Sequence, residues 1–377
     1  MLPSAPMIRR LLLCLPAALL AACTTSPVHP VVLTPTSPPP VVPAPAPVTP
    51  AANAQADLAT ARAAFVRETA QRFGIPARQI EAVLAQAQIR EPIRAAMANP
   101  AEAKPWREYR PIFLQPSRIE RGRAFLAAHR AALQRAEDTY GVPKELIVAI
   151  LGVETGYGVN QGRWPVLDAL YTLAFAYPRS GDPAKAAYED RRAAFFRDEL
   201  AQLFALAKDE GLDITTLKGS YAGAMGWGQF MPSSYRQYAV DGDGDGRRDL
   251  FNDLDDVIAS VANYFAKKGG WQPGGPVMLR AVRDAAATDL AQPGNTVVLD
   301  QTLASLASLG YRPAVTEVMP PPQTPAGLIT LDGEAGPEYW IVFNNFRAIT
   351  TYNLSRLYAT AVYQLSQAIA VQPEGEA

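Results

Sequence analysis

The chain has 377 residues, of which 49% are hydrophobic and 19% are charged, and its formal net charge is −1. This length allows more than one domain, and the near-neutral charge argues against a nucleic-acid partner. With only two histidines, His29 and His129, the chain lacks the ligands for a multi-histidine metal site and offers little for a Ser-His-Asp hydrolase, so carboxylates are the expected acid–base groups.

Residues 1–22 are typical of an export signal, because two arginines precede a short apolar run. The run ends in Leu20-Ala21-Ala22-Cys23, which resembles the cleavage motif of bacterial lipoproteins. We therefore expect cleavage before Cys23 and lipid attachment to it. By analogy with known lipoproteins, Thr24 favours the periplasmic face of the outer membrane. The alternative is an ordinary secretory signal with a cysteine there by chance.

A proline-rich segment follows the predicted lipidation site. Ten of the 27 residues from 24 to 50 are proline, so residues 23–56 are expected to form an extended linker rather than a core. From Asp57 the pattern becomes helical, and 57–140 is expected to be an N-terminal helical region. Its last helix is predicted from Ser117, where Glu120 completes a capping-box pattern, to Tyr140.

The segment from Leu146 to Gly158 is the most informative. Pro143 suits the first position of a helix, and the residues after it are apolar on nearly all sides, so this helix should be buried. Glu154 lies on the same face as Ile147 and Ile150, just before Gly-Tyr-Gly ends the helix. Burial raises the pKa of a carboxyl group, and such a group can act as a general acid. The alternative is a glutamate that simply reaches solvent.

Two further helices are predicted at 166–175 and 188–206, and a glycine-rich segment follows at 218–234. Four of its glycines alternate with aromatic residues, methionine and one glutamine. Glycines let backbone approach a ligand closely, although tight packing of core aromatics is the alternative reading. Ser234 with Gln237 predicts the cap of the next helix.

Residues 241–249 match the start of an EF-hand calcium loop. Oxygen ligands at Asp241, Asp243 and Asp245, a glycine at the sixth position and the carbonyl of Arg247 fit that pattern. The twelfth position is Asn252 rather than glutamate, so a later acid would have to complete the site. An acidic turn without metal remains the alternative.

After Trp271 the pattern changes, and 272–343 is expected to be a small α+β insert. Strands are predicted at 296–299, 328–331 and 339–343, with a helix at 301–309. The last segment, 344–377, contains a predicted helix from Ser355 to Ile369. The fold class is therefore mainly α with a small β component.

Four segments in order resemble the membrane-bound lytic murein transglycosylase B family. They are Val153-Glu154-Thr155, Gly223 to Ser233, the Asp241 loop and Ser260 to Phe265. The resemblance implies a lysozyme-like helical core over 141–271. It also implies cleavage of the β-1,4 bond between MurNAc and GlcNAc in peptidoglycan, leaving 1,6-anhydroMurNAc ends. Glu154 stands at the position of the single catalytic acid, which acts first as acid and then as base.

The resemblance also assigns residues around the cleft. It implies polar groups near the acid, aromatic walls, a C-terminal Tyr-Asn and Tyr, a cleft aromatic and an arginine after Tyr-Pro; these are Ser220, Gln229, Phe230, Tyr264, Tyr352, Asn353, Tyr358, Tyr109 and Arg179. For Tyr109 and Arg179, plain packing or a surface charge is the alternative. By its spacing from Ser260, Asp256 matches the closing metal ligand, with Asp255 as the second choice.

The sequence also departs from the family pattern, because Ser180 occupies the place where a second arginine is common. The calcium is expected to be structural, with no cofactor needed for the chemistry. The expected partners are peptidoglycan glycan strands and, through Cys23, the membrane, and the expected state is a monomer. A hydrolysing muramidase with a second carboxylate and a catalytically silent cell-wall-binding lipoprotein are the other functions considered.

Overall fold

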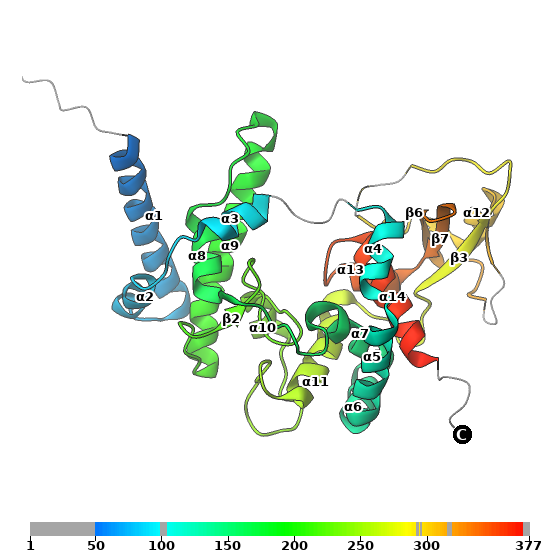
Figure 1. Ribbon diagram of the computed structural model, residues 1–377, viewed down its shortest axis with the longest axis horizontal. Coiled ribbons are helices and arrows are strands. Elements are labelled where there is room, and N and C mark those ends of the chain that lie inside the picture. The colour runs from blue at the N-terminus through cyan, green and yellow to red at the C-terminus, as the bar shows by residue number, and fades with distance from the viewer. Residues whose placement is uncertain (1–49, 99–103, 292–293, 295, 315–318, 372–377) are drawn as a thin grey trace, which may run out of the picture. The chain divides into compact units, whose positions relative to one another are not determined.

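The computed structural model describes residues 50–98, 104–291, 294, 296–314 and 319–371 (Figure 1). The predicted signal peptide, Cys23 and most of the proline-rich linker lie outside these residues. Within them the fold is mainly helical, with one five-stranded and one two-stranded antiparallel sheet, which confirms the predicted fold class. None of the described helices is both long and apolar enough to cross a bilayer.

The first three helices pack against a pair formed by α8 (Val166–Phe175) and α9 (Pro183–Glu210). These three are α1 (Pro50–Phe73), α2 (Ala77–Leu84) and α3 (Glu91–Ala98). Helix α1 begins at Pro50 rather than at Asp57, because the alanine-rich residues 51–56 favour helix. The predicted linker over 23–56 is therefore too long.

A buried carboxylate on α8 holds the connection between α2 and α3. Asp168 accepts hydrogen bonds from Gln88 N at 2.9 Å and from Arg90 Nε at 2.8 Å. The N-terminal helices are thereby fixed to α8 by a charged contact as well as by packing. Helix α9 begins earlier than the predicted residue 188, because the Asp182 side chain caps it by accepting from Ala184 N.

Two helices replace the single helix predicted from Ser117 to Tyr140. They are α5 (Pro116–Ala128) and α6 (Arg130–Tyr140), which are divided at His129. The predicted capping box is wrong, because Pro116 occupies the first turn and no side chain caps α5. The cap predicted at Ser234 is wrong for the same reason, since α10 (Pro232–Tyr238) begins with its proline. Helix α4 (Trp106–Phe113) precedes α5.

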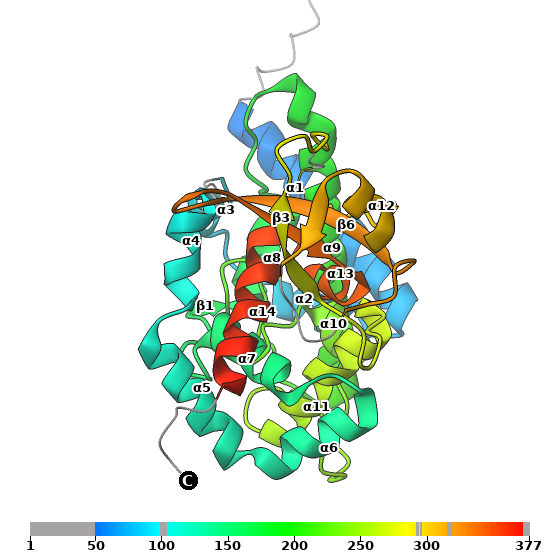
Figure 2. The same ribbon diagram turned by 90° about the vertical axis from the view of Figure 1, so that its right-hand side faces the viewer.

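Helix α7 (Lys144–Thr155) lies at the centre of the helices that follow α4. As predicted it is apolar nearly all round, and its residues from Leu146 to Gly152 are buried. It packs against α5, α6, α11 (Leu254–Tyr264) and α14 (Arg356–Ala370), which surround it in Figures 1 and 2. The helix ends at Gly156, which has a φ of +60°. Partly exposed residues lie only near its two ends, and Glu154 is one of them.

Two short strands and a π-helical turn connect these helices. Strand β1 (Trp164–Pro165) pairs with β2 (Lys218–Gly219) just before the glycine-rich segment. The π turn Phe265–Gly269 continues α11. These elements bring residues 218–231 next to the end of α7.

The insert after Trp271 is a five-stranded antiparallel sheet in the order β4-β6-β7-β3-β5. The predicted hairpin is present as β6 (Pro325–Gly333) and β7 (Gly336–Val342). The structure adds β3 (Met278–Arg283) and β5 (Tyr311–Pro313), which sequence reasoning did not find. The strand predicted at 296–299 is wrong, because this segment has no ladder partner and the sheet edge is β4 (Gln301–Thr302). Helix α12 (Leu303–Ser308) packs beside β6.

The chain returns from the sheet to the catalytic region through α13 (Asn344–Thr350) and α14. The Ser355 hydroxyl caps α14 by accepting from Tyr358 N at 3.2 Å, so the predicted C-terminal helix is confirmed. Because α14 packs along α7, the last helix of the chain contributes directly to the site described below.

A glycine after α7 provides a test of this packing. Gly158 has a φ of +81°, and a Cβ there would lie within 2.5 Å of the Trp227 ring. We expect Gly158→Ala to lower the free energy of unfolding by about 2–4 kcal/mol, from left-handed strain and overpacking together. Gly156→Ala is the matched control, since its φ is also positive but no atom lies within 4 Å of its Cβ. Urea unfolding curves check this, and equal losses in both variants would contradict it.

Candidate active site

Glu154 lies in the last turn of α7 with its carboxyl group only partly exposed. The hydroxyl of Tyr358 on α14 donates a hydrogen bond to Glu154 Oε1 at 2.5 Å. Tyr358 itself is 3% exposed, and it reaches Glu154 from 204 positions along the chain. The contact leaves the other carboxylate oxygen, Oε2, available for a different partner.

The surroundings of Glu154 raise its pKa. Burial raises the pKa of this carboxyl group to about 7, and the hydrogen bond from Tyr358 offsets part of that rise. Burial also raises the pKa values of Tyr352 and Tyr358 well above the usual range, and the charge of Glu154 adds to the rise. Both phenols therefore remain protonated donors near neutral pH. A carboxyl group with this pKa can give up and take back a proton at neutral pH.

Aromatic rings from three segments lie together beside this carboxyl group. Tyr352 packs against Tyr264 with ring centres 4.9 Å apart, and against Phe230 with ring centres 5.9 Å apart. The Tyr352 hydroxyl donates to Gly228 O at 2.6 Å, and the Tyr264 hydroxyl donates to Thr351 O at 2.7 Å. The structure thus brings together three of the predicted aromatic site residues.

The glycine-rich segment folds into a tight loop held by its own polar groups. Gln229 has a φ of +51°, and its side-chain amide donates to Gln161 O and Gly226 O. The Ser220 hydroxyl accepts hydrogen bonds from Ala222 N and Ala224 N. Both side chains therefore shape the loop, and their predicted contacts with substrate stay predictions.

Thr155 is a residue that sequence reasoning left without a role. Its buried hydroxyl lies 3.1 Å from Trp227 O, to which it can donate, and it accepts from Gly158 N at 3.0 Å. The contact fixes the glycine-rich loop to the turn that follows Glu154. The sequence feature that could have pointed to this role is a threonine placed directly between the candidate acid and a glycine.

The remaining predicted cleft residues differ in their positions. Tyr109 on α4 packs against Phe113 and lies near enough to Tyr358 to affect its pKa. Asn353 is partly buried in the turn before α14. Arg179 instead forms an ion pair of 2.7 Å with Asp190 on α9, and none of its described contacts joins it to Glu154. Its role as a substrate ligand stays a prediction.

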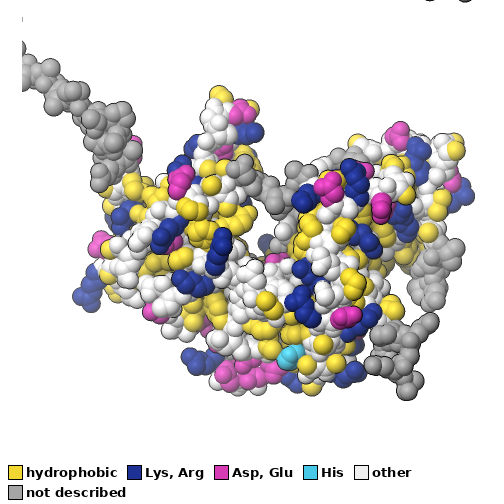
Figure 3. All heavy atoms as spheres, in the orientation of Figure 1, with side chains coloured by type: hydrophobic (Ala, Val, Ile, Leu, Met, Phe, Trp, Pro, Cys, Tyr) yellow, Lys and Arg dark blue, Asp and Glu magenta, His cyan; other side chains and the backbone are white. Residues whose placement is uncertain are grey.

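Three carboxylates gather where the loop that begins at Asp241 meets the first turn of α11. Asp241, Asp243 and Asp256 have carboxylate oxygens within 4.8 Å of one another, and Figure 3 shows acidic side chains gathered over this loop. Asp256 is 1% exposed and accepts from Gly242 N at 2.6 Å and Asp249 N at 2.7 Å. Among the described residues no lysine or arginine forms an ion pair with these three. Clustered oxygen ligands without a neutralising side chain fit a hard cation such as Ca²⁺.

The geometry separates the two candidates for the closing ligand. Asp256 is one of the three clustered carboxylates, whereas Asp255 forms an ion pair of 3.1 Å with Arg135 on α6. The predicted ligand Asp245 is not among the three clustered carboxylates. Its own carboxylate accepts a hydrogen bond from Arg247 N at 2.8 Å. The predicted roles of Asp245 and of the Arg247 carbonyl stay predictions.

Comparison with known proteins identifies the family. The model of the transglycosylase SLT domain matches residues 57–367, which is most of the chain. The chain belongs to this family. It is 39% identical over 323 residues to membrane-bound lytic murein transglycosylase B of Escherichia coli, with 81% of this chain and 82% of that protein covered. The resemblance found in the sequence is thereby confirmed.

Solved structures of other family members share the fold. The lytic transglycosylase Slt35 of Escherichia coli in complex with calcium is 38% identical, with a TM-score of 0.70. The match covers 82% of this chain and 92% of that chain. SltB3 of Pseudomonas aeruginosa in complex with NAG-NAM-pentapeptide is 30% identical, with a TM-score of 0.69 and coverage of 83% and 79%. The transglycosylase fold is therefore shown by sequence and by structure together.

The raised pKa of Glu154 predicts a stability cost at high pH. Its ordinary pKa of 4.5 applies in the unfolded chain, so the stabilising contribution is complete below pH 4.5 and is lost as the pH rises through about 7. Gln cannot ionise, so we expect Glu154→Gln to be more stable than the wild type by about 1–3 kcal/mol at pH 8. Near pH 4.5 the difference should be small.

Urea unfolding at both pH values measures this difference. Glu81→Gln, at an exposed position on α2, is the matched control and should change stability equally little at either pH. A Glu154→Gln variant that is no more stable than the wild type at pH 8 would contradict the raised pKa.

Proposed function

We propose that the protein is a lytic transglycosylase that cleaves the β-1,4 bond between MurNAc and GlcNAc in peptidoglycan and leaves a 1,6-anhydroMurNAc end. Glu154 is the catalytic acid and base. The observation that carries this proposal is a carboxyl group with a pKa of about 7, hydrogen-bonded to Tyr358 and placed beside an aromatic cluster. Family membership supports the reaction class.

The proposed reaction needs one proton to move twice. Protonated Glu154 gives its proton to the glycosidic oxygen, and the bond between that oxygen and C1 of MurNAc breaks. The N-acetyl oxygen of MurNAc stabilises the cationic sugar. The Glu154 carboxylate then takes the proton of the C6 hydroxyl, whose oxygen bonds to C1. The net reaction cleaves the glycosidic bond without consuming water, and Glu154 is protonated again at the end.

The environment of Glu154 favours this single-carboxylate route over hydrolysis. A two-carboxylate glycosidase places its second acid about 5–10 Å from the first. Among the described residues, burial and Tyr358 account for the pKa shift of Glu154, and no other carboxylate contributes. A single carboxyl group that gives up the proton and takes it back fits this environment.

The residues around Glu154 receive complementary roles. Tyr358 orients the carboxyl group, so that Oε2 faces the bound sugar. Tyr352 is partly exposed and offers a ring on which a sugar can stack, because sugar rings have apolar faces. Phe230 and Tyr264 are buried beside it and would form the aromatic wall that holds it in place. Ser220, Gln229, Asn353 and Tyr109 line the remaining approach, and Arg179 would reach more distant parts of the substrate.

The loop before α11 is proposed to hold one structural Ca²⁺. Asp241, Asp243 and Asp256 supply carboxylate oxygens, with Asp245 and the Arg247 carbonyl as the further expected ligands. The proposal is supported by the clustered carboxylates and by the relative named in complex with calcium. The ion would connect the loop to α11, which carries Tyr264, and would take no part in the chemistry.

The proposed location is the periplasmic face of the outer membrane. Cleavage of residues 1–22 and lipidation of Cys23 would anchor the protein, and the linker would carry the catalytic body toward peptidoglycan. The name of the membrane-bound relative supports membrane association. A monomeric state and the domain limits of the sequence analysis, with the linker shortened to end before Pro50, belong to the same proposal.

Product mass tests the reaction directly. The purified full chain in detergent, incubated with peptidoglycan sacculi, should release muropeptides that are one water lighter than reducing-end products. Glu154→Gln should release at least about 100-fold less, because general acid–base catalysis supplies that much or more. Mass spectrometry of the soluble products is the measurement.

Other products would contradict the proposal, each in a different way. Reducing-end products would make the protein a hydrolase with another carboxylate. Binding to sacculi without products from either form would make it a cell-wall-binding lipoprotein. Glu81→Gln serves as the control and should release products at the wild-type rate.

Calcium should raise the melting temperature of the protein. Binding to the folded state adds RT ln(1 + [Ca²⁺]/Kd), which is about 2.7 kcal/mol at a hundredfold excess over Kd. We expect Asp243→Asn to lose most of this shift, since it removes one carboxylate of the group. Asp57→Asn, at an exposed position on α1, is the control. If neither added calcium nor a chelator changes the melting temperature of the wild type, the calcium site is refuted.

A further inference from the structure

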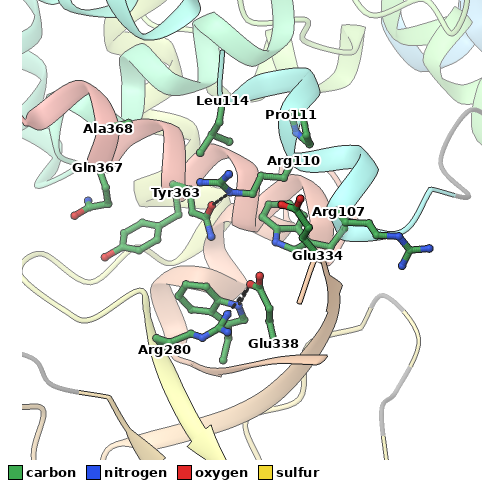
Figure 4. Close-up of a pocket in the computed structure, with 13 residues that line it drawn as sticks. Arg107, Arg110, Pro111, Leu114, Arg280, Glu334, Glu338, Tyr363, Gln367 and Ala368 are labelled. Atoms are coloured by element: carbon green, nitrogen blue, oxygen red, sulfur yellow. Dashed lines mark hydrogen bonds and ion pairs between the residues drawn. The ribbon is translucent and has the colours of Figure 1, made fainter. Parts of the chain in front are cut away.

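A second pocket lies away from Glu154, between the helices α4 and α14 and the sheet. Its volume is about 690 Å³, within the range of small-ligand sites. Figure 4 shows Arg110 and Tyr363 projecting from the helices on one side, and Arg280 and Glu338 from the strands on the other. Nothing in the proposed reaction uses this pocket.

The pocket and the catalytic carboxyl group lie on opposite sides of α14. Tyr358 faces Glu154, whereas Gln367, nine residues later, lines the pocket. Nine residues at 100° each place these two side chains half a turn apart around the helix. A ligand in the pocket would therefore leave the cleft beside Glu154 open.

The sheet side of the pocket is a fixed aromatic and charged wall. Arg280 forms an ion pair of 2.6 Å with Glu338, and its guanidinium lies 5.1 Å from the centre of the Trp340 ring. The Trp340 indole donates to the same carboxylate at 3.2 Å. These mutual contacts hold the indole in place as a surface for an apolar or planar group.

Two charged side chains at the pocket have no ionic partner among the described residues. Arg110 is exposed and donates through Nε to the Gln364 side chain at 2.9 Å, but it forms no ion pair. Glu334, in the turn between β6 and β7, is also exposed, and no ion pair or hydrogen bond of its side chain is present. The pocket thus offers one cation and one anion to a ligand.

We propose that this pocket is a second, non-catalytic site that binds a peptide carrying both a carboxylate and an ammonium group, namely the stem peptide of peptidoglycan. The inference rests on the proposed function, which supplies that substrate. An uncharged glycan would use neither Arg110 nor Glu334, and a simple anion could pair with Arg110 but would leave Glu334 without a partner. The site would hold one strand of the cell wall while the cleft acts on another.

Binding of the free stem peptide tests the proposal without any turnover. The probe is L-Ala-γ-D-Glu-meso-diaminopimelate-D-Ala, titrated by calorimetry into the full chain in detergent. Arg110→Gln and Glu334→Gln should each weaken binding about tenfold, the loss expected for one charge-assisted contact. Arg78→Gln and Glu81→Gln, exposed on α2, remove the same charges elsewhere and should leave the affinity unchanged.

Product release by the same variants separates this site from the catalytic cleft. On peptide-free glycan strands, Arg110→Gln and Glu334→Gln should match the wild type, because Glu154 and its neighbours are unchanged. Peptide binding that survives both substitutions would place the peptide elsewhere and overturn the proposal. If the wild type releases anhydro products but binds no peptide, the second site fails while the proposed function stands. If it binds peptide but releases none, the proposed function fails.

Discussion

An apolar helix that ends in a carboxyl group is the constraint on which the catalytic region depends. Because α7 is buried on nearly every side, α5, α6, α11 and α14 must enclose it. The enclosure buries the middle of the helix, and Glu154 in its last turn is held in an environment that keeps its pKa near 7. Packing and acid strength therefore have the same cause.

The groups that complete the site come from distant parts of the chain. The glycine-rich loop supplies Phe230, α11 supplies Tyr264, and the C-terminal segment supplies Tyr352 and Tyr358. Thr155 and the Trp227 backbone join the loop to α7, and the carboxylate loop lies directly before α11. The proposed metal site and the proposed aromatic wall therefore share one helix, through which an ion remote from the reaction would act on the cleft.

The sequence predicted features whose cause is local. The apolar run of α7 and the position of Glu154 at its end could be read directly, whereas the choice of Asp256 came from the family resemblance. The caps predicted at Ser117 and Ser234 were wrong, because a nearby proline begins each helix earlier. The bond between Tyr358 and Glu154 and the strands β3 and β5 depend on partners far away in the sequence, which no local pattern encodes.

The position of α14 at the end of the chain has a consequence for biosynthesis. A chain still emerging from the ribosome can form α7 early, but Tyr358 follows Glu154 by 204 residues and is absent until synthesis is nearly complete. Closing such a long loop is among the slow steps of folding. The hydrogen bond that the proposed mechanism requires at Glu154 therefore forms late, and a chain truncated before α14 would lack it.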